Sequence, residues 1–274
     1  MKKFFILFFT LLVLTVPVFA STNKMSQEYL KGKKHFSPVT FIAENTAEKV
    51  LEKALKKNTK SDFDVKIKAY NLSSMKEGIF KYAEFSTKDL VIEEIPIAML
   101  NIKTDSDYNW IDYRENPIIC KSDMVYSYTL HLTEDSINQA LKHKEYFKTL
   151  QKVNQKAYPL FTLHDVKVKT LGDKVRIMMD YSLPLAQNNK VKSFSITTDF
   201  VVNENIVKAY NVTYDKAYGN LGESKVANLI NLLDPLSFTL KLLNTKKCNT
   251  RIENVKIIDN IIQINGKIYV KAEG

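Results

Sequence analysis

Apolar and polar side chains alternate through residues 161–214, the longest patterned stretch of the chain. From Val175 to Tyr181 the apolar residues fall on odd positions, and from Phe194 to Val202 they fall on even positions, with polar residues mostly between them. A period of two is typical of strands that bury one face. The stretch therefore predicts a meander of antiparallel strands. Turn-forming residues separate these strands at residues 172–173, 187–189 and 203–205.

Helical spacing of apolar residues predicts three amphipathic helices outside this meander. The first runs from a capping box at Asn45 to about Lys57. The second begins at Thr133, and Phe147, Leu150 and Val153 extend its apolar stripe. The third covers residues 221–233 and ends before the pair Asp234-Pro235. Further strands are predicted between and after the helices. They lie at residues 63–69, 79–85, 90–95, 98–104, 124–132, 251–258 and 261–270. Each helix precedes antiparallel strands, so we predict an α+β fold.

The N-terminal residues have the pattern of a secretory signal. Two lysines precede an apolar run from Phe4 to Val16, and small residues follow as far as Ala20. The run is too short to cross a bilayer as a helix. We expect cleavage after Ala20 and export to the periplasm, the cell envelope or the extracellular space. We predict that residues 21–44 form an N-terminal tether and that residues 45–274 form a single domain.

Lysine dominates the positive charge of the chain. The formal net charge is +10, and removal of residues 1–20 lowers it to +8 because these residues contain two lysines and no acid. Only Arg114, Arg176 and Arg251 are arginines. Since base and phosphate recognition relies on arginine, we expect no nucleic-acid partner. A diffuse excess of lysine suits solubility or weak, peripheral attraction to an anionic membrane surface.

Cys120 and Cys248 are the only cysteines, and both lie in polar segments. Export would allow a disulfide between them, because an oxidising compartment preserves such bonds. The sequence gives no distance between the two thiols, so two unpaired thiols remain an equal alternative.

No motif in the chain points to catalysis, to a cofactor or to a metal ion. The seven glycines form neither a phosphate loop nor a dinucleotide fingerprint, and the four histidines show no paired spacing for zinc. The spacing from Asp105 to Asn109 is similar to a calcium loop, but Trp110 stands where that loop requires glycine. His164 and Asp165 lie where the apolar parity of a strand shifts, which predicts a structural bulge. We therefore expect a protein that is not an enzyme.

The remaining candidate chemistry is apolar surface. If the sheet encloses the helices incompletely, its apolar face lines a groove for an acyl chain, and ten to fifteen buried methylenes contribute about 8 to 12 kcal/mol. The predicted lining consists of Val50, Leu51, Leu55, Phe63, Val65, Ile67, Ile137, Leu141, Val175, Ile177, Met179, Phe194, Ile196 and Phe200. On basic helix faces, Lys53, Lys144 and Lys148 are candidates for headgroup contact.

Three segments resemble the LmeA-like phospholipid-binding family of exported bacterial proteins. They are residues 132–141 (LTEDSINQAL), 229–236 (LINLLDPL) and 255–266 (VKIIDNIIQING). The resemblance extends over about residues 45–270. It implies a fold akin to the tubular lipid-binding proteins, in which a long, highly curved antiparallel sheet wraps around amphipathic helices. It also implies binding of phospholipid in the cell envelope and provides no catalytic residues.

Two other functions remain open at this point. A scaffold or adaptor would use a sheet edge or a basic face to bind an envelope protein, and a fully packed interior would favour it. An envelope hydrolase would depend on His164–Asp165 and on the polar residues 105–112.

Overall fold

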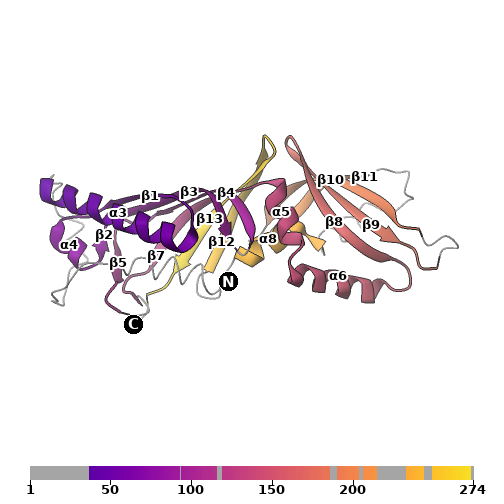
Figure 1. The fold of residues 1–274 in the computed structure, drawn as a ribbon, viewed down its shortest axis with the longest axis horizontal. Helices are drawn as coiled ribbons and strands as arrows, with labels where there is room; N and C mark the ends of the chain where they lie inside the picture. The colour runs from indigo at the N-terminus through magenta and orange to yellow at the C-terminus, as the bar shows by residue number, and fades with distance from the viewer. Residues whose placement is uncertain are drawn as a thin grey trace.

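The computed structural model describes residues 37–92, 94–115, 119–185, 190–203, 206–214, 233–243 and 249–272. Over these residues the chain forms an elongated molecule with two large antiparallel sheets arranged along its long axis (Figure 1). The predicted α+β class is confirmed, because antiparallel strands dominate and a few helices accompany them. Residues 1–20 and 21–36, which include the predicted signal, lie outside the described residues.

The larger sheet has six strands in the order β1-β3-β4-β7-β13-β12, and each strand is antiparallel to its neighbours. The strand β13 pairs with β7, so the C-terminal hairpin joins a sheet that the N-terminal half of the chain began. Its strands are β1 (Phe63–Lys68), β3 (Tyr82–Ile92), β4 (Ile95–Thr104), β7 (Met124–Leu132), β12 (Asn249–Ile258) and β13 (Ile261–Val270).

The second sheet is the predicted meander and has the strand order β11-β10-β9-β8. Leu171 pairs with Lys174 across the predicted turn, where Gly172 adopts a φ of 65°. The predicted bulge is also confirmed, because the register shifts between Leu163 and Asp165. The turn residues 187–189 and 204–205 lie outside the described residues. The four strands are β8 (Thr162–Leu171), β9 (Lys174–Ser182), β10 (Lys192–Asn203) and β11 (Ile206–Tyr214).

One long sheet was predicted, and this is wrong for the described strands, which divide among separate sheets. Pairing of β13 with β7 leaves β12 as an edge, and β12 lies beside β10 without joining its ladder. The β8–β9 and β12–β13 hairpins meet at their turns (Figure 1). There the Gly172 N–H donates to Asn260 Oδ1 (2.8 Å), and the Asn260 N–H donates to the Gly172 carbonyl (3.2 Å).

Helix α3 (Pro38–Thr59) begins earlier than the sequence predicted. Ser37 is its N-cap and accepts the Thr40 N–H, while Pro38 occupies the first turn, where its missing N–H costs nothing. This start is stronger than a capping box at Asn45, which lies inside the helix. The predicted tether therefore ends before Pro38, and residues 38–44 belong to the helix.

The second predicted helix is two helices, α5 (Glu134–Leu141) and α6 (Lys144–Ala157). Thr133 caps α5 as predicted, and His143 caps α6 by accepting the Glu145 N–H on Nδ1 (3.3 Å). The restart changes the helical phase. As a result Tyr146, and not the predicted Phe147, lies in the core.

A helix that the sequence did not predict follows Asp234. Helix α8 (Pro235–Leu243) begins where an Asp-Pro pair was interpreted as a helix end. Of the predicted helix before it, residues 221–232 lie outside the described residues.

Residues 79–104 also differ from the predicted strands. The segments predicted at 79–85 and 90–95 are mostly one strand, β3, which continues through the polar residues between them because the buried Thr87 donates to the Asp62 carbonyl (2.6 Å). Ile92 pairs with Ile95, so β3 and β4 form a hairpin. The polar segment after β4 joins a third, small sheet. The strands of this small sheet are β2 (Ile79–Phe80), β5 (Asn109–Asp112) and β6 (Ile119–Cys120), and the short helix α4 (Leu72–Lys76) precedes β2.

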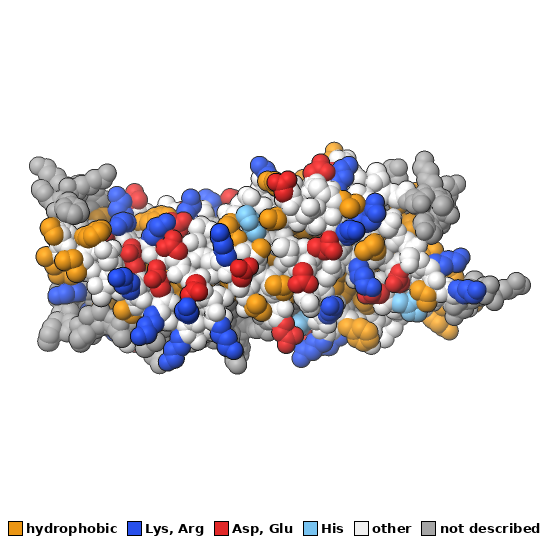
Figure 2. Space-filling model, turned by 45° about the horizontal axis from the view of Figure 1, so that its top comes forward, with side chains coloured by type: hydrophobic (Ala, Val, Ile, Leu, Met, Phe, Trp, Pro, Cys, Tyr) orange, Lys and Arg blue, Asp and Glu red, His pale blue; other side chains and the backbone are white. Residues whose placement is uncertain are grey.

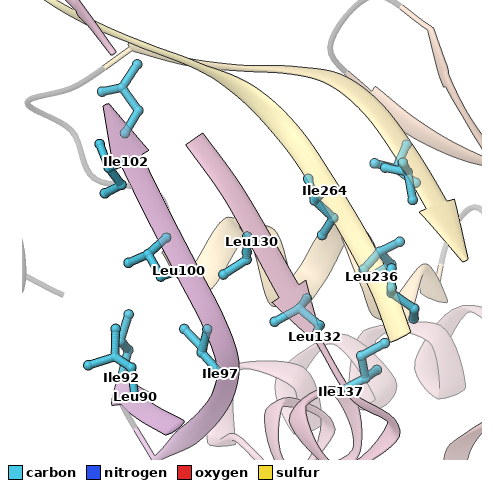
Figure 3. Packing of buried hydrophobic residues seen from close by; sticks show 14 of the residues in the cluster. Leu90, Ile92, Ile97, Leu100, Ile102, Leu130, Leu132, Ile137, Leu236 and Ile264 are labelled. Atoms are coloured by element: carbon cyan, nitrogen blue, oxygen red, sulfur yellow. The ribbon is translucent and has the colours of Figure 1, made fainter. Parts of the chain in front are cut away.

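One apolar cluster extends through both large sheets. In β13 the buried residues Ile262, Ile264, Ile268 and Val270 alternate with partly exposed ones. Figure 3 shows Leu130, Leu132 and Ile264 on neighbouring strands of the six-stranded sheet, with Ile137 of α5 and Leu236 of α8 near the end of these strands. Helices α5 and α8 therefore lie at the junction between the two sheets (Figure 1).

Candidate functional site

Helix α3 is fixed to the edge strand β1 by three glutamates spaced four residues apart. The N–H groups of Val65, Ile67 and Ala69 donate to Oε1 of Glu52 (3.3 Å), Glu48 (2.8 Å) and Glu44 (2.7 Å), respectively. Lys68 also forms an ion pair with Glu44 (3.3 Å). The carboxylates replace a neighbouring strand, so this edge of the sheet has no free N–H row at these positions.

Helices α5 and α6 close the edge of the second sheet in a similar way. The side-chain amide of Asn138 accepts the Val168 N–H and donates to its carbonyl, both at 2.8 Å. Asn154 of α6 forms the same pair of bonds with Leu163 (2.7 and 2.8 Å), and Glu134 accepts the Thr170 N–H (3.0 Å). Each sheet therefore has a helix hydrogen-bonded to its first strand.

These bonds orient the apolar faces of the helices toward the predicted lining. Eleven of the fourteen predicted lining residues are buried. The other three, Val50, Phe63 and Phe200, are half-buried. The buried residues are Leu51, Leu55, Val65, Ile67, Ile137, Leu141, Val175, Ile177, Met179, Phe194 and Ile196.

The structure brings the buried lining residues into one cluster and covers them tightly. Ile177 and Ile196 are 1% and 0% exposed, so protein atoms cover almost their whole surface. An acyl chain could reach these two side chains only if the surrounding elements separated.

The three lysines predicted to contact a headgroup are not brought together. Lys53 is exposed on α3, which lies along the six-stranded sheet, whereas Lys144 and Lys148 are exposed on α6, beside the other sheet (Figure 1). Lys148 forms an ion pair with Glu145 (2.8 Å), which lowers the pKa of that carboxyl. A single headgroup could therefore contact the lysines of one helix or of the other.

Of the two cysteines, Cys120 is buried at the end of β6, and Cys248 lies outside the described residues. Their pairing therefore stays a prediction. Cys120 belongs to the small sheet formed by β2, β5 and β6 and is not in an exposed loop.

His164 and Asp165 lie in the bulge but do not interact as a catalytic pair. His164 Nε2 lies 2.8 Å from the hydroxyl of the buried Ser182. The Asp165 carboxylate accepts the Val166 N–H (2.9 Å) and forms an ion pair with Lys167 (2.9 Å). The carboxylate is thus committed elsewhere and does not orient the imidazole, as a hydrolytic triad would require.

A buried polar group at the junction was missed by the sequence interpretation. Asp234 is 8% exposed, and its Oδ1 accepts the N–H groups of Leu236 and Ser237 at 3.1 Å. Burial raises the pKa of this carboxyl. Beside it the Tyr146 hydroxyl donates to the Leu233 carbonyl (3.2 Å), and burial likewise raises the pKa of Tyr146. The Asp-Pro pair, which is a common start of a helix, was the available signal.

The comparisons with known proteins found no match to a family model, to a curated protein or to a solved structure. Within the described parts of the chain, no helix has the length and apolar character needed to cross a membrane. Among the same residues, no group of three or more His, Cys, Asp or Glu side chains could hold a metal ion.

Proposed function

We propose that the protein is an exported, non-catalytic binder of a phospholipid or a similar amphiphile. The acyl chains of the lipid enter between the helices and the sheets of the protein. This arrangement is the one implied by the resemblance to the LmeA-like family and to tubular lipid-binding proteins. The headgroup lies near the lysines of α6 or of α3.

The observation that carries this proposal is an apolar core shared by two sheets that do not pair with each other. Ile196 of β10 and Val255 of β12 belong to one cluster, yet no described strand of one sheet forms a ladder with the other. Side chains at such a junction can separate without breaking strand hydrogen bonds. An inserted acyl chain then replaces the apolar contacts that were lost, so the exchange costs little.

Lipid analysis of the purified protein tests the proposal. We expect mass spectrometry of an organic extract to show a phospholipid, and the delipidated protein to take up lipid from vesicles. Phe200→Ser should weaken uptake about tenfold or more, because Phe200 is half-buried against the core at this junction.

The neighbouring Val201→Ser is the matched control, since Val201 is 45% exposed on the opposite face of β10. It should leave uptake unchanged. A protein that carries no lipid and takes up none from vesicles would contradict the proposal, as would equal effects of the two substitutions.

The tight cover over Ile177 and Ile196 favours a second candidate, a scaffold that binds an envelope protein. That function needs no opening of the core. Stoichiometric purification of one envelope protein with a lipid-free chain, together with uptake that is absent at every lipid concentration, would support it over the first candidate.

A further inference from the structure

Four large apolar side chains are exposed at the outer end of the four-stranded sheet. Tyr158, Leu160, Leu185 and Val191 are 70%, 71%, 72% and 60% exposed, respectively. Isolated exposed apolar residues are ordinary, but several at one end of a molecule indicate a contact surface. We call these four residues the apolar end.

Strand register places the four residues together. Thr162 pairs with Ser182, and Tyr181 pairs with Lys192, so the start of β8, the end of β9 and the start of β10 share one end of the sheet. Leu160 precedes β8, Leu185 follows β9 and Val191 precedes β10, while Tyr158 ends α6. This end points outward along the long axis, away from the six-stranded sheet (Figure 1).

The charge at this end is uniformly positive along the segments that form it. Residues 146–164 and 181–198 contain no aspartate or glutamate. Lys156, Lys190 and Lys192 are exposed there. Of the acids that border these segments, Asp180 accepts the Ser193 hydroxyl (2.7 Å) and Asp165 forms an ion pair with Lys167. Figure 2 shows blue and orange side chains close together at the corresponding end of the surface.

Apolar side chains surrounded by lysines match the interface of an anionic bilayer. Tyrosine favours the headgroup level, leucine and valine favour the acyl boundary, and lysine ammonium groups contact anionic headgroups. A second copy of the chain fits less well, since it would bring the same lysines face to face. Four residues are also far fewer than the 20 to 30 or so that a stable protein interface uses on each side.

We propose that the apolar end docks the protein on an anionic phospholipid membrane. Tyr158, Leu160, Leu185 and Val191 insert at the interface, and Lys156, Lys190 and Lys192 bind the headgroups around them. The long axis then points away from the membrane. This docking does not depend on acyl-chain binding in the core, and a protein with an empty core would still dock.

Tryptophan placed at the apolar end reports insertion directly. Leu160→Trp should be quenched by brominated lipid in vesicles of phosphatidylglycerol and phosphatidylcholine, because its indole would lie at the acyl boundary. Val91→Trp, at a site that is 58% exposed on the six-stranded sheet, is the matched control and should not be quenched. Both variants also contain the native Trp110, and its fluorescence is measured in the parent protein and subtracted.

Substitution of Lys156, Lys190 and Lys192 tests the electrostatic contribution to membrane docking. Each lysine near an anionic surface contributes about a fivefold gain in partitioning, so the triple variant K156Q/K190Q/K192Q should bind these vesicles about a hundredfold more weakly. Raising the salt concentration from about 0.1 M to about 0.5 M should also weaken binding of the parent protein to these vesicles. The variant K88Q/K103Q/K256Q removes three exposed lysines of the six-stranded sheet and should bind as the parent does.

Three results would overturn the proposal. The first is absence of quenching at Leu160→Trp, or equal quenching at Val91→Trp. The second is quenching of Ile42→Trp alone, because Ile42 is 64% exposed near the N-terminus of α3 and the membrane contact would then lie there. The third is a concentration-dependent dimer, seen by analytical ultracentrifugation, that Leu160→Ser abolishes, because the occupant would then be a second copy.

Discussion

Gly266 shows how closely the strands of the six-stranded sheet are packed at single residues. It pairs with Tyr128 of β7 on one side and with Ile252 of β12 on the other. A Cβ built on Gly266 would lie 2.1 Å from the Arg251 carbonyl oxygen and 2.6 Å from the Tyr128 hydroxyl oxygen. Burial raises the pKa of Tyr128 to about 12, so this hydroxyl stays protonated at neutral pH.

Gly266→Ala should therefore destabilise the protein by about 3 kcal/mol, since a backbone carbonyl must move to admit the methyl group. Urea unfolding measures this loss. Gly172→Ala is the control, because no atom lies within 4 Å of its Cβ position and only its φ of 65° opposes the substitution, at a cost of about 1 kcal/mol. Equal losses for the two variants would show that the predicted clash at Gly266 is absent.

Parity along a strand predicted the buried side chains of β9 and β10 well, because alternate residues of a strand must face opposite sides. Val175, Ile177 and Ile196 are nearly inaccessible, as predicted. Helical spacing was less successful in α6, where Phe147 is 60% exposed. Helical phase depends on where a helix starts, and a restart after His143 is set by a cap that apolar periodicity does not reveal.

At the scale of elements, the same device recurs in both sheets: a helix hydrogen-bonds the open side of the first strand. The three glutamates of α3 form a regular series, and this spacing is visible in the sequence. What they bind is not visible there, because helix spacing shows which residues share a face and not what that face meets. The ends of strands were also predicted poorly where polar residues interrupt the apolar pattern. A strand can continue through such residues when they form hydrogen bonds with other parts of the fold, and the sequence does not show those bonds.

Glu48→Ala should destabilise the protein by about 1.5 kcal/mol, because the Ile67 N–H at a covered edge loses its acceptor. Amide hydrogen exchange should be faster at Ile67 than in the parent, with little change at distant β13 amides. Glu48→Gln keeps a carbonyl acceptor and should lose less.

Lys49→Ala changes an exposed residue beside Glu48 and should alter stability by no more than about 0.5 kcal/mol. If exchange at Ile67 were the same in the parent and in Glu48→Ala, the bond between α3 and β1 would not protect this edge.

At the scale of the whole molecule, the pairing of strands that are distant in the sequence could not be predicted from the pattern of apolar residues. Pairing of β13 with β7 joins distant parts of the chain, and alternation within each strand is equally compatible with a single meander. The division into two sheets follows from this pairing. It also creates the junction on which the proposed lipid binding depends, where the hairpin turns of β8–β9 and β12–β13 are hydrogen-bonded.

Asn260→Gly tests whether this junction controls access to the core. Asn260 has a φ of 65°, so glycine keeps the turn while removing the side-chain acceptor of the Gly172 N–H. We expect the free energy of unfolding to change by less than about 1 kcal/mol, because one solvent-exposed hydrogen bond is lost. Exchange of the Gly172 amide and the rate of lipid uptake from vesicles should both rise severalfold.

Asp259→Gly is the matched control for this substitution, since Asp259 has a φ of 50° in the same turn. It leaves the Gly172 bond to Asn260 intact and should leave uptake at the rate of the parent. If Asn260→Gly speeds exchange at Gly172 but not uptake, the hairpin contact opens without admitting lipid. Acyl chains would then have to enter elsewhere along the boundary between β10 and β12, where the described strands of the two sheets form no ladder with each other.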